Sequence, residues 1–394
     1  MKTRPRHDGA ARHAGRGLCP RGRQGTKAIL TLLLSLIMAA GFPSFAADQD
    51  RLIKELQQHA ARSPSTWSGL PGKDARERVQ PAPDIVIDYL RKDNALNGYQ
   101  ERPRQAKVDP SFLRDIHAAV DELPQTAGKH MEEHVIAVFL VQDLGTTGFV
   151  ELLRDFDQNR LGFIVLDVDF LNKKANEWIT WRENSPFRDN GAYAVEAEIE
   201  REEHDSRKSA IQYILLHELG HLVGVAKGAH PNWFAGGDPR AWPFAGLSWL
   251  THKTALNGES RYDNFFRTRK ALKFYAFQNA ALSSEAIGET FTALSGTDFV
   301  SLYAATNMYD DFAETYAMYV HVILQKKPWR VRVMKNGKIV TELREPILTP
   351  RLIKKKEYLQ ELFKKEISHR PLRPLPESRA DLSFGAGDRQ TRFV

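Results

Sequence analysis

Two histidines and a glutamate in the segment His217-Glu218-Leu219-Gly220-His221 have the types and spacing of a metal site. On a helix, residues four apart lie on one face, so both imidazoles can reach the same ion. Imidazole nitrogens in this arrangement are typical zinc ligands. Glu218 lies beside the first histidine, where its carboxylate can take a proton from a water molecule on the metal. The sequence therefore predicts a zinc site with a general base next to it.

The flanking residues predict a helix that carries this motif. Asp205 or Ser206 can cap its start, apolar residues run from Ile211 to Val223, and Gly224 stands where the helix would end. A chance pentapeptide on a buried helix is the alternative interpretation. The intact helical context, together with carboxylates further along the chain, favours the metal site.

A third ligand has to come from elsewhere in the chain, because a catalytic zinc site uses three protein ligands and leaves a position for water. The metzincin pattern H-x-x-G-x-x-H does not supply it, since Lys227 occupies the last position and His230 lies three residues too late. Asp310 and Glu314 are better candidates, four residues apart on a predicted helix. That helix is otherwise apolar and aromatic, so its carboxylates need a partner such as a metal with its histidines. A solvated acidic face is the alternative.

These motifs resemble those of gluzincin metallopeptidases of the anthrax lethal factor and Pro-Pro endopeptidase type. In that group H-E-x-x-H is followed by Y-x-x-T-N and then by an acidic helix containing F-A-E. The second pattern is matched by Tyr303, Thr306, Asn307, Phe312, Ala313 and Glu314. The resemblance covers about residues 110–325 and implies a zincin-like fold with zinc-dependent hydrolysis of peptide bonds.

The resemblance also implies roles for the downstream residues. In those relatives a glutamate seven residues after the tyrosine is the third ligand, and an acid four residues later orients the site. The ligand position falls here on Asp310 and the orienting position on Glu314, with the shorter Asp requiring the helix to lie closer to the metal. Both stay open as the third ligand, Asp310 ahead of Glu314 and Asp311 a distant third. Tyr303 would donate a hydrogen bond to the oxyanion of the reaction, and a core tyrosine is the alternative.

The remaining pattern predicts an α+β fold: a mixed sheet with an edge strand, the H-E-x-x-H helix and a second, acidic helix. Strict alternation makes Tyr193–Glu200 a half-buried edge strand, which we expect to pair with an extended peptide. Residues 226–254 are loop-like and aromatic, either a wall of a cleft or ordinary packing. The other expected elements are a helix at Asp48–Arg62, a helix from Pro110 to Leu123 capped by Asp109, strands at Val135–Val141 and Phe163–Phe170, a helix within Tyr262–Ala281, a hairpin of Arg330–Met334 with Lys338–Leu343, and a solvated basic helix near Pro350–Lys365.

Residues 1–46 have the three-part layout of a secretory signal peptide. Eight Lys and Arg precede the apolar run Ala28–Gly41, and Ser44 and Ala46 occupy positions −3 and −1 of a cleavage site. The run is too short for an ordinary membrane span, and an uncleaved signal anchor is the alternative. Cys19, the only cysteine, leaves with this leader, so no disulfide is expected. The layout predicts a periplasmic or extracellular protein.

Removing the leader changes the charge balance. The leader holds eight of the 56 basic residues and one of the 49 acidic residues, which leaves 48 of each. The mature chain is therefore neutral, and nothing in its composition favours nucleic acid as a partner. We divide it into an N-terminal helical and loop segment (47–107), a zincin-like catalytic domain (108–326), a C-terminal hairpin with a basic helix (327–368) and a disordered tail (369–394).

The sequence as a whole predicts a secreted or periplasmic zinc-dependent metalloendopeptidase that acts on a peptide or protein and has no stable membrane span after signal cleavage. Two alternatives stay open: an envelope hydrolase of amide or peptidoglycan crosslinks, and a domain that binds zinc without catalysis. Glu218 argues against the second, because a structural site has no use for a base. The sequence specifies neither the substrate nor the oligomeric state.

Overall fold

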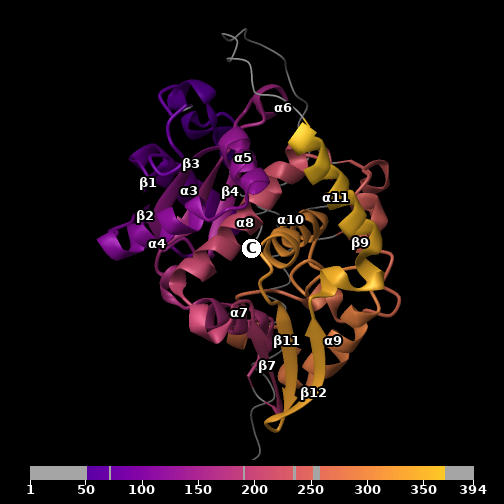
Figure 1. Cartoon of the computed structure of the whole chain (residues 1–394). Coiled ribbons are helices and arrows are strands. Elements are labelled where there is room, and N and C mark those ends of the chain that lie inside the picture. Colours follow the sequence, from indigo (N-terminus) through magenta and orange to yellow (C-terminus); the bar gives the residue numbers. More distant parts are fainter. Residues whose placement is uncertain (1–50, 71, 190, 234–236, 252–257, 369–394) are drawn as a thin grey trace, which may run out of the picture. The chain divides into compact units, whose positions relative to one another are not determined.

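A computed structural model describes residues 51–70, 72–189, 191–233, 237–251 and 258–368 (Figure 1). The expected signal peptide and C-terminal tail lie outside these residues. Segments from all three remaining predicted regions contribute to one compact unit that begins at Arg51. It is a mixed α+β structure, as predicted. Among the described helices, none is both long and apolar enough to cross a bilayer.

The larger sheet is mixed and places an antiparallel strand at one edge. Its members are β1 (Val79–Pro81), β2 (Arg104–Gln105), β3 (Val135–Gln142), β4 (Gly148–Leu152) and β5 (Gly162–Asp167). The order is β1-β3-β5-β4, with β2 beside the end of β3; β1 and β5 run parallel to β3, and β4 runs antiparallel to β5. The sequence prediction missed β4, a short strand that begins with a glycine.

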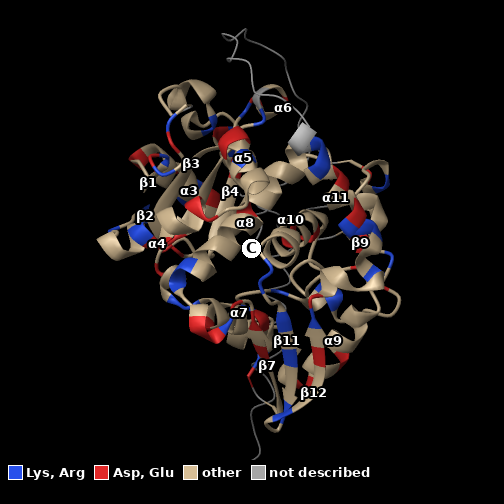
Figure 2. Cartoon of the chain, viewed as in Figure 1, with Lys and Arg blue, Asp and Glu red and all other residues tan. Residues whose placement is uncertain are grey.

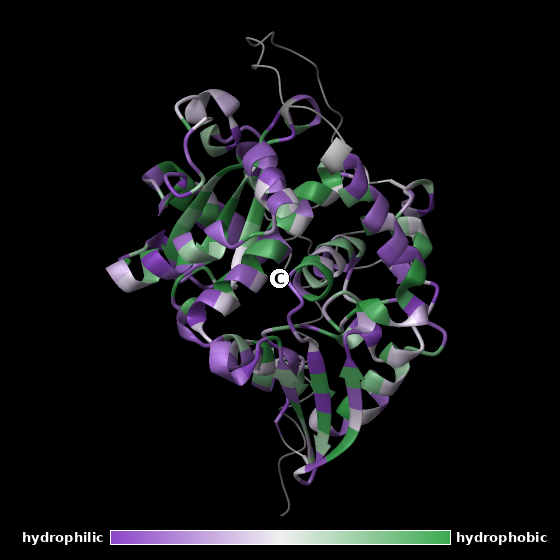
Figure 3. Cartoon of the chain, in the orientation of Figure 1, coloured by the Kyte–Doolittle hydropathy of each residue, from purple (hydrophilic) through white to green (hydrophobic). Residues whose placement is uncertain are grey.

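The central strand β3 is apolar from Val135 to Val141 because both faces of the sheet are covered (Figure 3). Ile136 and Phe139 face one core, which also holds residues of α3 (Asp84–Asn97). Val138 and Leu140 face the other core. Helices α4 (Pro110–Asp121), α5 (Gln125–His134) and α8 (Arg207–Ala226) contribute to that second core.

Helix α8 carries the H-E-x-x-H motif and is buried along most of its length. Of the two predicted caps, Asp205 and Ser206, the cap is Ser206, whose hydroxyl accepts a hydrogen bond from the Ser209 amide. The expected end at Gly224 is wrong, since the helix continues to Ala226. Gly224 is instead a point of close approach: a Cβ there would lie 2.2 Å from His230 Nε2.

A second sheet consists of β7 (Tyr193–Glu198), β11 (Arg330–Lys335) and β12 (Lys338–Arg344), in the order β12-β11-β7. The predicted hairpin is confirmed, and its turn residues Asn336 and Gly337 both have positive φ, at 48° and 73°. Basic and acidic side chains alternate across the strands and form ion pairs, such as Arg332 with Glu198 (Figure 2).

The strand β7 lies at the sheet edge, but its open side is already occupied. Three residues of α7 (Ala175–Asn184), spaced one turn apart, form hydrogen bonds through their side chains with its backbone and with the two residues after it. The Asn184 side chain accepts a hydrogen bond from the Val195 amide at 2.9 Å and donates one to the Val195 carbonyl at 2.7 Å. The Thr180 hydroxyl accepts from the Ala197 amide at 2.9 Å and donates to the Ala197 carbonyl at 3.0 Å. The Asn176 side chain accepts hydrogen bonds from the Ile199 and Glu200 amides. The expectation that this edge pairs with a peptide is therefore wrong.

Three further sequence expectations fail locally. The strand predicted at Phe163–Phe170 stops at Asp167, whose carboxylate accepts the amides of Leu144 (2.7 Å) and Asp169 (2.8 Å) and turns the chain. No long helix forms within residues 262–281, which contain two short 3-10 turns. Asp48–Arg62 is only partly helical, over residues 51–57 with a 3-10 turn after them; residues 48–50 lie outside the described part.

The aromatic segment after α8 belongs to the core rather than to a cleft. Phe244 is fully buried and Trp249 is 1% exposed. Trp249 donates its indole N–H to Asp311 at 3.0 Å. Of the two interpretations left open for the described residues of 226–254, the structure supports ordinary packing.

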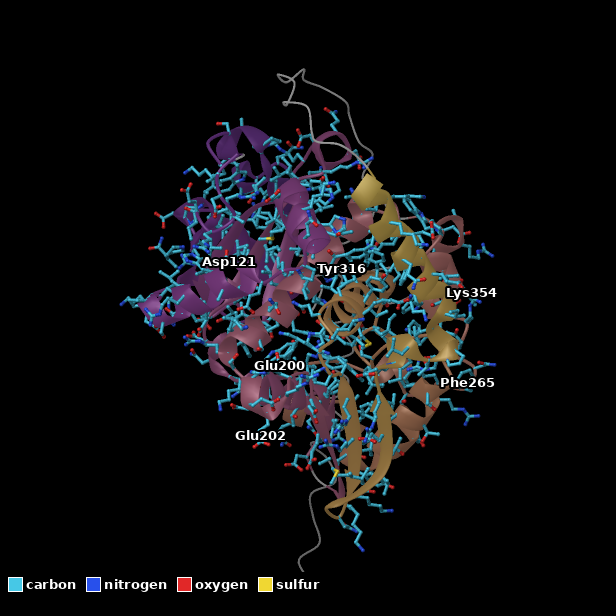
Figure 4. All side chains as sticks on the ribbon, viewed as in Figure 1. Asp121, Glu200, Glu202, Phe265, Tyr316 and Lys354 are labelled. Atoms are coloured by element: carbon cyan, nitrogen blue, oxygen red, sulfur yellow. The ribbon has the colours of Figure 1, made fainter. Side chains whose placement is uncertain are left out.

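The basic helix α11 (Ile353–Ser368) is not merely solvated. Its Lys355 is completely buried and donates to both carboxylate oxygens of Asp311, at 2.6 and 2.7 Å. Lys354, the neighbouring residue, points outward, whereas Tyr316 of α10 (Met308–Met318) lies inside the fold (Figure 4). The pair therefore fixes the C-terminal helix to the acidic helix.

Replacing Lys355 by Ala is expected to lower the free energy of unfolding by about 3–5 kcal/mol, because it leaves the buried Asp311 carboxylate unpaired. Urea denaturation measures this change. Lys354→Ala is the matched control on the same helix and should stay within about 0.5 kcal/mol. Equal effects of the two substitutions would show that the buried pair does not anchor α11.

Candidate metal centre

Three nitrogen and oxygen atoms from two helices converge at one point. His217 and His221 lie one turn apart on α8, and their Nε2 atoms are 3.1 Å apart. Asp310 Oδ1, from α10, lies 3.6 Å from His217 Nε2 and 3.4 Å from His221 Nε2. All three side chains are buried. The structure thus brings both motif histidines together with one of the two predicted acids.

The spacing and the donor set fit a zinc ion. Nitrogen and oxygen ligands about 2.0–2.1 Å from a tetrahedral zinc lie about 3.3–3.4 Å from one another. Asp310 Oδ2 accepts hydrogen bonds from Thr306 (2.9 Å) and Asn307 (2.5 Å), whereas Oδ1 accepts none from the described residues. A buried carboxylate with one oxygen fixed and the other directed at two imidazoles has the arrangement expected of a metal ligand.

Close packing of the two helices allows the short Asp310 side chain to reach the histidines. Gly220, within the motif, lies against Ala313 of α10, and a Cβ on Gly220 would be 2.8 Å from the Ala313 Cα. A larger residue at 220 would push α10 away. The helix start is fixed as well, since the Asn307 side chain accepts the Tyr309 and Asp310 amides.

Glu314, the other predicted acid, faces the opposite side of His217. Its Oε1 accepts a hydrogen bond from His217 Nδ1 at 3.0 Å, which leaves Nε2 of that ring free to face the convergence point. Ser301 donates to Oε2 at 2.9 Å. Burial favours the protonated form of Glu314, but Arg182 and His217 outweigh burial and hold its pKa well below the usual range.

Arg182, from α7, is a site residue that the sequence did not reveal. It donates to both oxygens of Glu314, at 2.9 and 3.2 Å, and to Glu183 at 2.9 Å. Its guanidinium also lies 4.9 Å from the centre of the Tyr303 ring. An arginine on an unassigned helix carries no motif, so only the tertiary contacts identify it.

The charges around the convergence point are unbalanced. Among the described residues, four buried carboxylates surround this point, those of Glu183, Glu218, Asp310 and Glu314, and Arg182 pairs with two of them, Glu183 and Glu314. Burial by itself lowers the pKa of the His217 imidazole, but the carboxylates outweigh it and raise the pKa to about 10. A divalent cation at this point would offset the excess negative charge.

Glu218 lines the same cavity, next to the histidines and beside strand β4. Its Oε1 lies so close to Gly148 that a Cβ on that residue would be 2.2 Å away. Burial is the main cause that raises the pKa of Glu218 to about 7. A carboxylate with that pKa is suited to accept and return a proton near neutral pH.

Tyr303 also lines the cavity, with its ring edge-on to His217 at 5.3 Å between centroids. Phe274 packs against its other side at 4.6 Å. No hydrogen bond to the described residues engages the Tyr303 hydroxyl. Burial is the largest of the causes that hold the pKa of this phenol well above its ordinary value, so it stays a donor.

The cavity is small, about 30 Å³, and one wall is the open edge of β4. Residues 146–150 line it together with α7 and α8. Because β4 pairs only with β5 among the described strands, its other edge can accept further backbone hydrogen bonds before Leu152, whose amide and carbonyl already bond the side chains of Glu151 and Arg62. A larger groove of about 540 Å³ lies between Val225 and Leu362. Its lining includes neither the motif histidines nor Glu218, Asp310 or Tyr303.

The remaining candidates lie outside the convergence point. Asp311 is engaged by Lys355 and Trp249. His230 Nδ1 lies 3.0 Å from the Pro231 carbonyl oxygen, and Lys227 forms an ion pair with Glu133 at 3.6 Å. None of these residues joins the group formed by the two motif histidines and Asp310.

Comparison with known proteins gives no match: no family model, curated protein or solved structure is similar to this chain at a significant level.

Proposed function

We propose that the chain is a zinc-dependent metalloendopeptidase with a zincin-like catalytic domain. The observation that carries this proposal is the convergence of His217 Nε2, His221 Nε2 and Asp310 Oδ1 in a cavity that also holds Glu218. The gluzincin resemblance of the two motifs supports it, and the signal-like leader supports export to the periplasm or beyond the cell.

In this proposal His217, His221 and Asp310 hold the metal, while Glu314 fixes the tautomer and orientation of His217. The chemistry that zinc supplies when bound is Lewis-acid activation of water and of a carbonyl group. Glu218 takes the proton of the attacking water on its carboxylate and passes it to the leaving amine. The Tyr303 hydroxyl donates a hydrogen bond to the carbonyl oxygen as negative charge develops there.

The substrate would lie along β4. An extended peptide can add to the open edge of this strand through backbone hydrogen bonds, which bring its carbonyls past Glu218. This assignment replaces the predicted use of Tyr193–Glu200, whose edge is filled by α7. A purely structural zinc site fits less well, because the described ligand group has three members and adjoins a cavity.

The purified chain is expected to bind close to one zinc ion and to lose peptide hydrolysis when a chelator removes the metal, without unfolding. The buried core of the described unit is large enough to hold the fold without metal. Metal analysis measures the zinc content, a quenched fluorescent peptide library measures hydrolysis, and circular dichroism measures whether the protein stays folded. Absence of bound zinc at neutral pH with zinc supplied would contradict the proposal.

A further inference from the structure

Two hydroxyl groups that line the cavity form a hydrogen bond with each other. Thr147, just before β4, and Tyr275, in the segment after the short turn Arg269–Ala271, approach to 3.1 Å between Oγ1 and the phenol oxygen. Both residues line the cavity, which thereby lies between the edge of β4 and Tyr275. Tyr275 as a whole residue is partly exposed.

The backbone that presents Tyr275 is strained. Tyr275 and Phe277 have φ values of 59° and 47°, a region that residues with side chains rarely adopt. Ser185, at the end of α7, holds both in place: its Oγ accepts the Tyr275 amide and its carbonyl accepts the Phe277 amide, each at 2.8 Å. Strain maintained by specific contacts is characteristic of functional segments.

Among the described residues, several contacts anchor the backbone and the ring of this segment, whereas one hydrogen bond holds the Tyr275 hydroxyl. Trp181 of α7 packs against the Tyr275 ring at 5.4 Å and the Phe277 ring at 5.1 Å. Phe170 contacts the Trp181 ring at 5.5 Å and the Tyr275 ring at 6.4 Å. The phenol hydroxyl, by contrast, is held across the cavity by the contact with Thr147.

The closed cavity does not accommodate a peptide. Its volume of about 30 Å³ corresponds to about one water molecule. Sites for small ligands usually measure about 300–1,000 Å³. A substrate that reaches Glu218 along β4 must therefore separate Thr147 from Tyr275.

We propose that Tyr275 is the movable wall of the substrate cleft: its phenol closes on Thr147 in the free protein and turns to a backbone carbonyl of the bound peptide when the cleft is filled. This inference rests on the proposed peptidase function. A phenol suits both positions because it donates and accepts hydrogen bonds. The anchored base keeps the ring beside the cleft in both.

Access to the metal tests the closed position. Zinc-loaded protein is mixed with 1,10-phenanthroline, and the rate of zinc loss is followed for the unaltered chain, Thr147→Val and Tyr275→Phe. Each substitution removes the hydroxyl contact, so both should accelerate zinc loss about fivefold, the change typical of one lost hydrogen bond. Tyr358→Phe, on a partly buried tyrosine of α11 away from the cavity, should change nothing. Unchanged rates in both cavity variants would overturn the proposal.

Peptide binding tests the open position. In a Glu218→Gln background, which binds without turnover, Thr147→Val should tighten or preserve the affinity for a fluorescent peptide, because opening no longer opposes binding. Tyr275→Phe should weaken it about fivefold relative to Thr147→Val, because the peptide loses a hydrogen bond. Equal affinities would overturn the peptide contact. Failure of the proposed function would instead appear as no hydrolysis by the unaltered zinc-loaded chain, whatever the rates of zinc loss.

Discussion

Replacing Glu218 by Gln is expected to lower kcat by about 10²–10⁴-fold while zinc stays bound, because the substitution removes a general base and keeps the shape of the side chain. The conserved shape matters here, since the Glu218 carboxylate fits tightly against Gly148. Both histidines and Asp310 are untouched, so the metal content should not change. Steady-state kinetics on a peptide substrate, together with metal analysis, measure the two quantities.

Glu289→Gln provides the matched control, because it makes the same change of charge away from the cavity. Glu289 is an exposed glutamate of α9 (Ile287–Ser295). It should retain full activity. If the Glu218 variant kept more than about a tenth of kcat, the carboxylate would not be the base of the reaction. If the Glu218 variant lost zinc as well, its loss of activity would result from the missing metal and not from the missing base.

Asp310→Asn and Glu314→Gln are expected to separate a metal ligand from the residue that orients one. Each substitution removes one negative charge and keeps the shape of the side chain. A difference in zinc affinity between the two variants therefore arises from the position of the carboxylate. Asp310→Asn weakens the oxygen that faces both Nε2 atoms and should lower zinc affinity by more than about 100-fold. Glu314→Gln alters the partner of His217 Nδ1 and should lower it by about 10–100-fold.

A competition titration with a zinc chelator measures both affinities. Because Glu314 also pairs with the buried Arg182, its variant should lose stability in the metal-free form as well, which urea unfolding can record separately. The assignment of ligands would be reversed if Glu314→Gln released the metal while Asp310→Asn retained it. Similar losses in the two variants would mean that neither carboxylate dominates binding.

Local sequence patterns were sufficient for the motif helix α8 and for one hairpin. Apolar residues at helical spacing and a capping serine predicted α8, and the Asn336-Gly337 turn predicted the β11–β12 hairpin. Both depend on interactions within a few residues, which the sequence states directly. The same logic failed for residues 262–281, where long-range contacts prevail: Arg269 donates to the carbonyls of Gly258 and Ala305 and holds the chain in turns.

The sequence by itself determined the chemistry available to this protein: two imidazoles one helical turn apart, an adjacent carboxylate and two acids on a second helix. It left Asp310 and Glu314 open because both occupy one face of α10. Only the tertiary structure places Arg182 beside Glu314 and directs Asp310 Oδ1 at the histidines. Likewise, strict alternation marked β7 as an edge strand but did not show that side chains of α7 cover this edge, because that depends on how the helix packs against the strand.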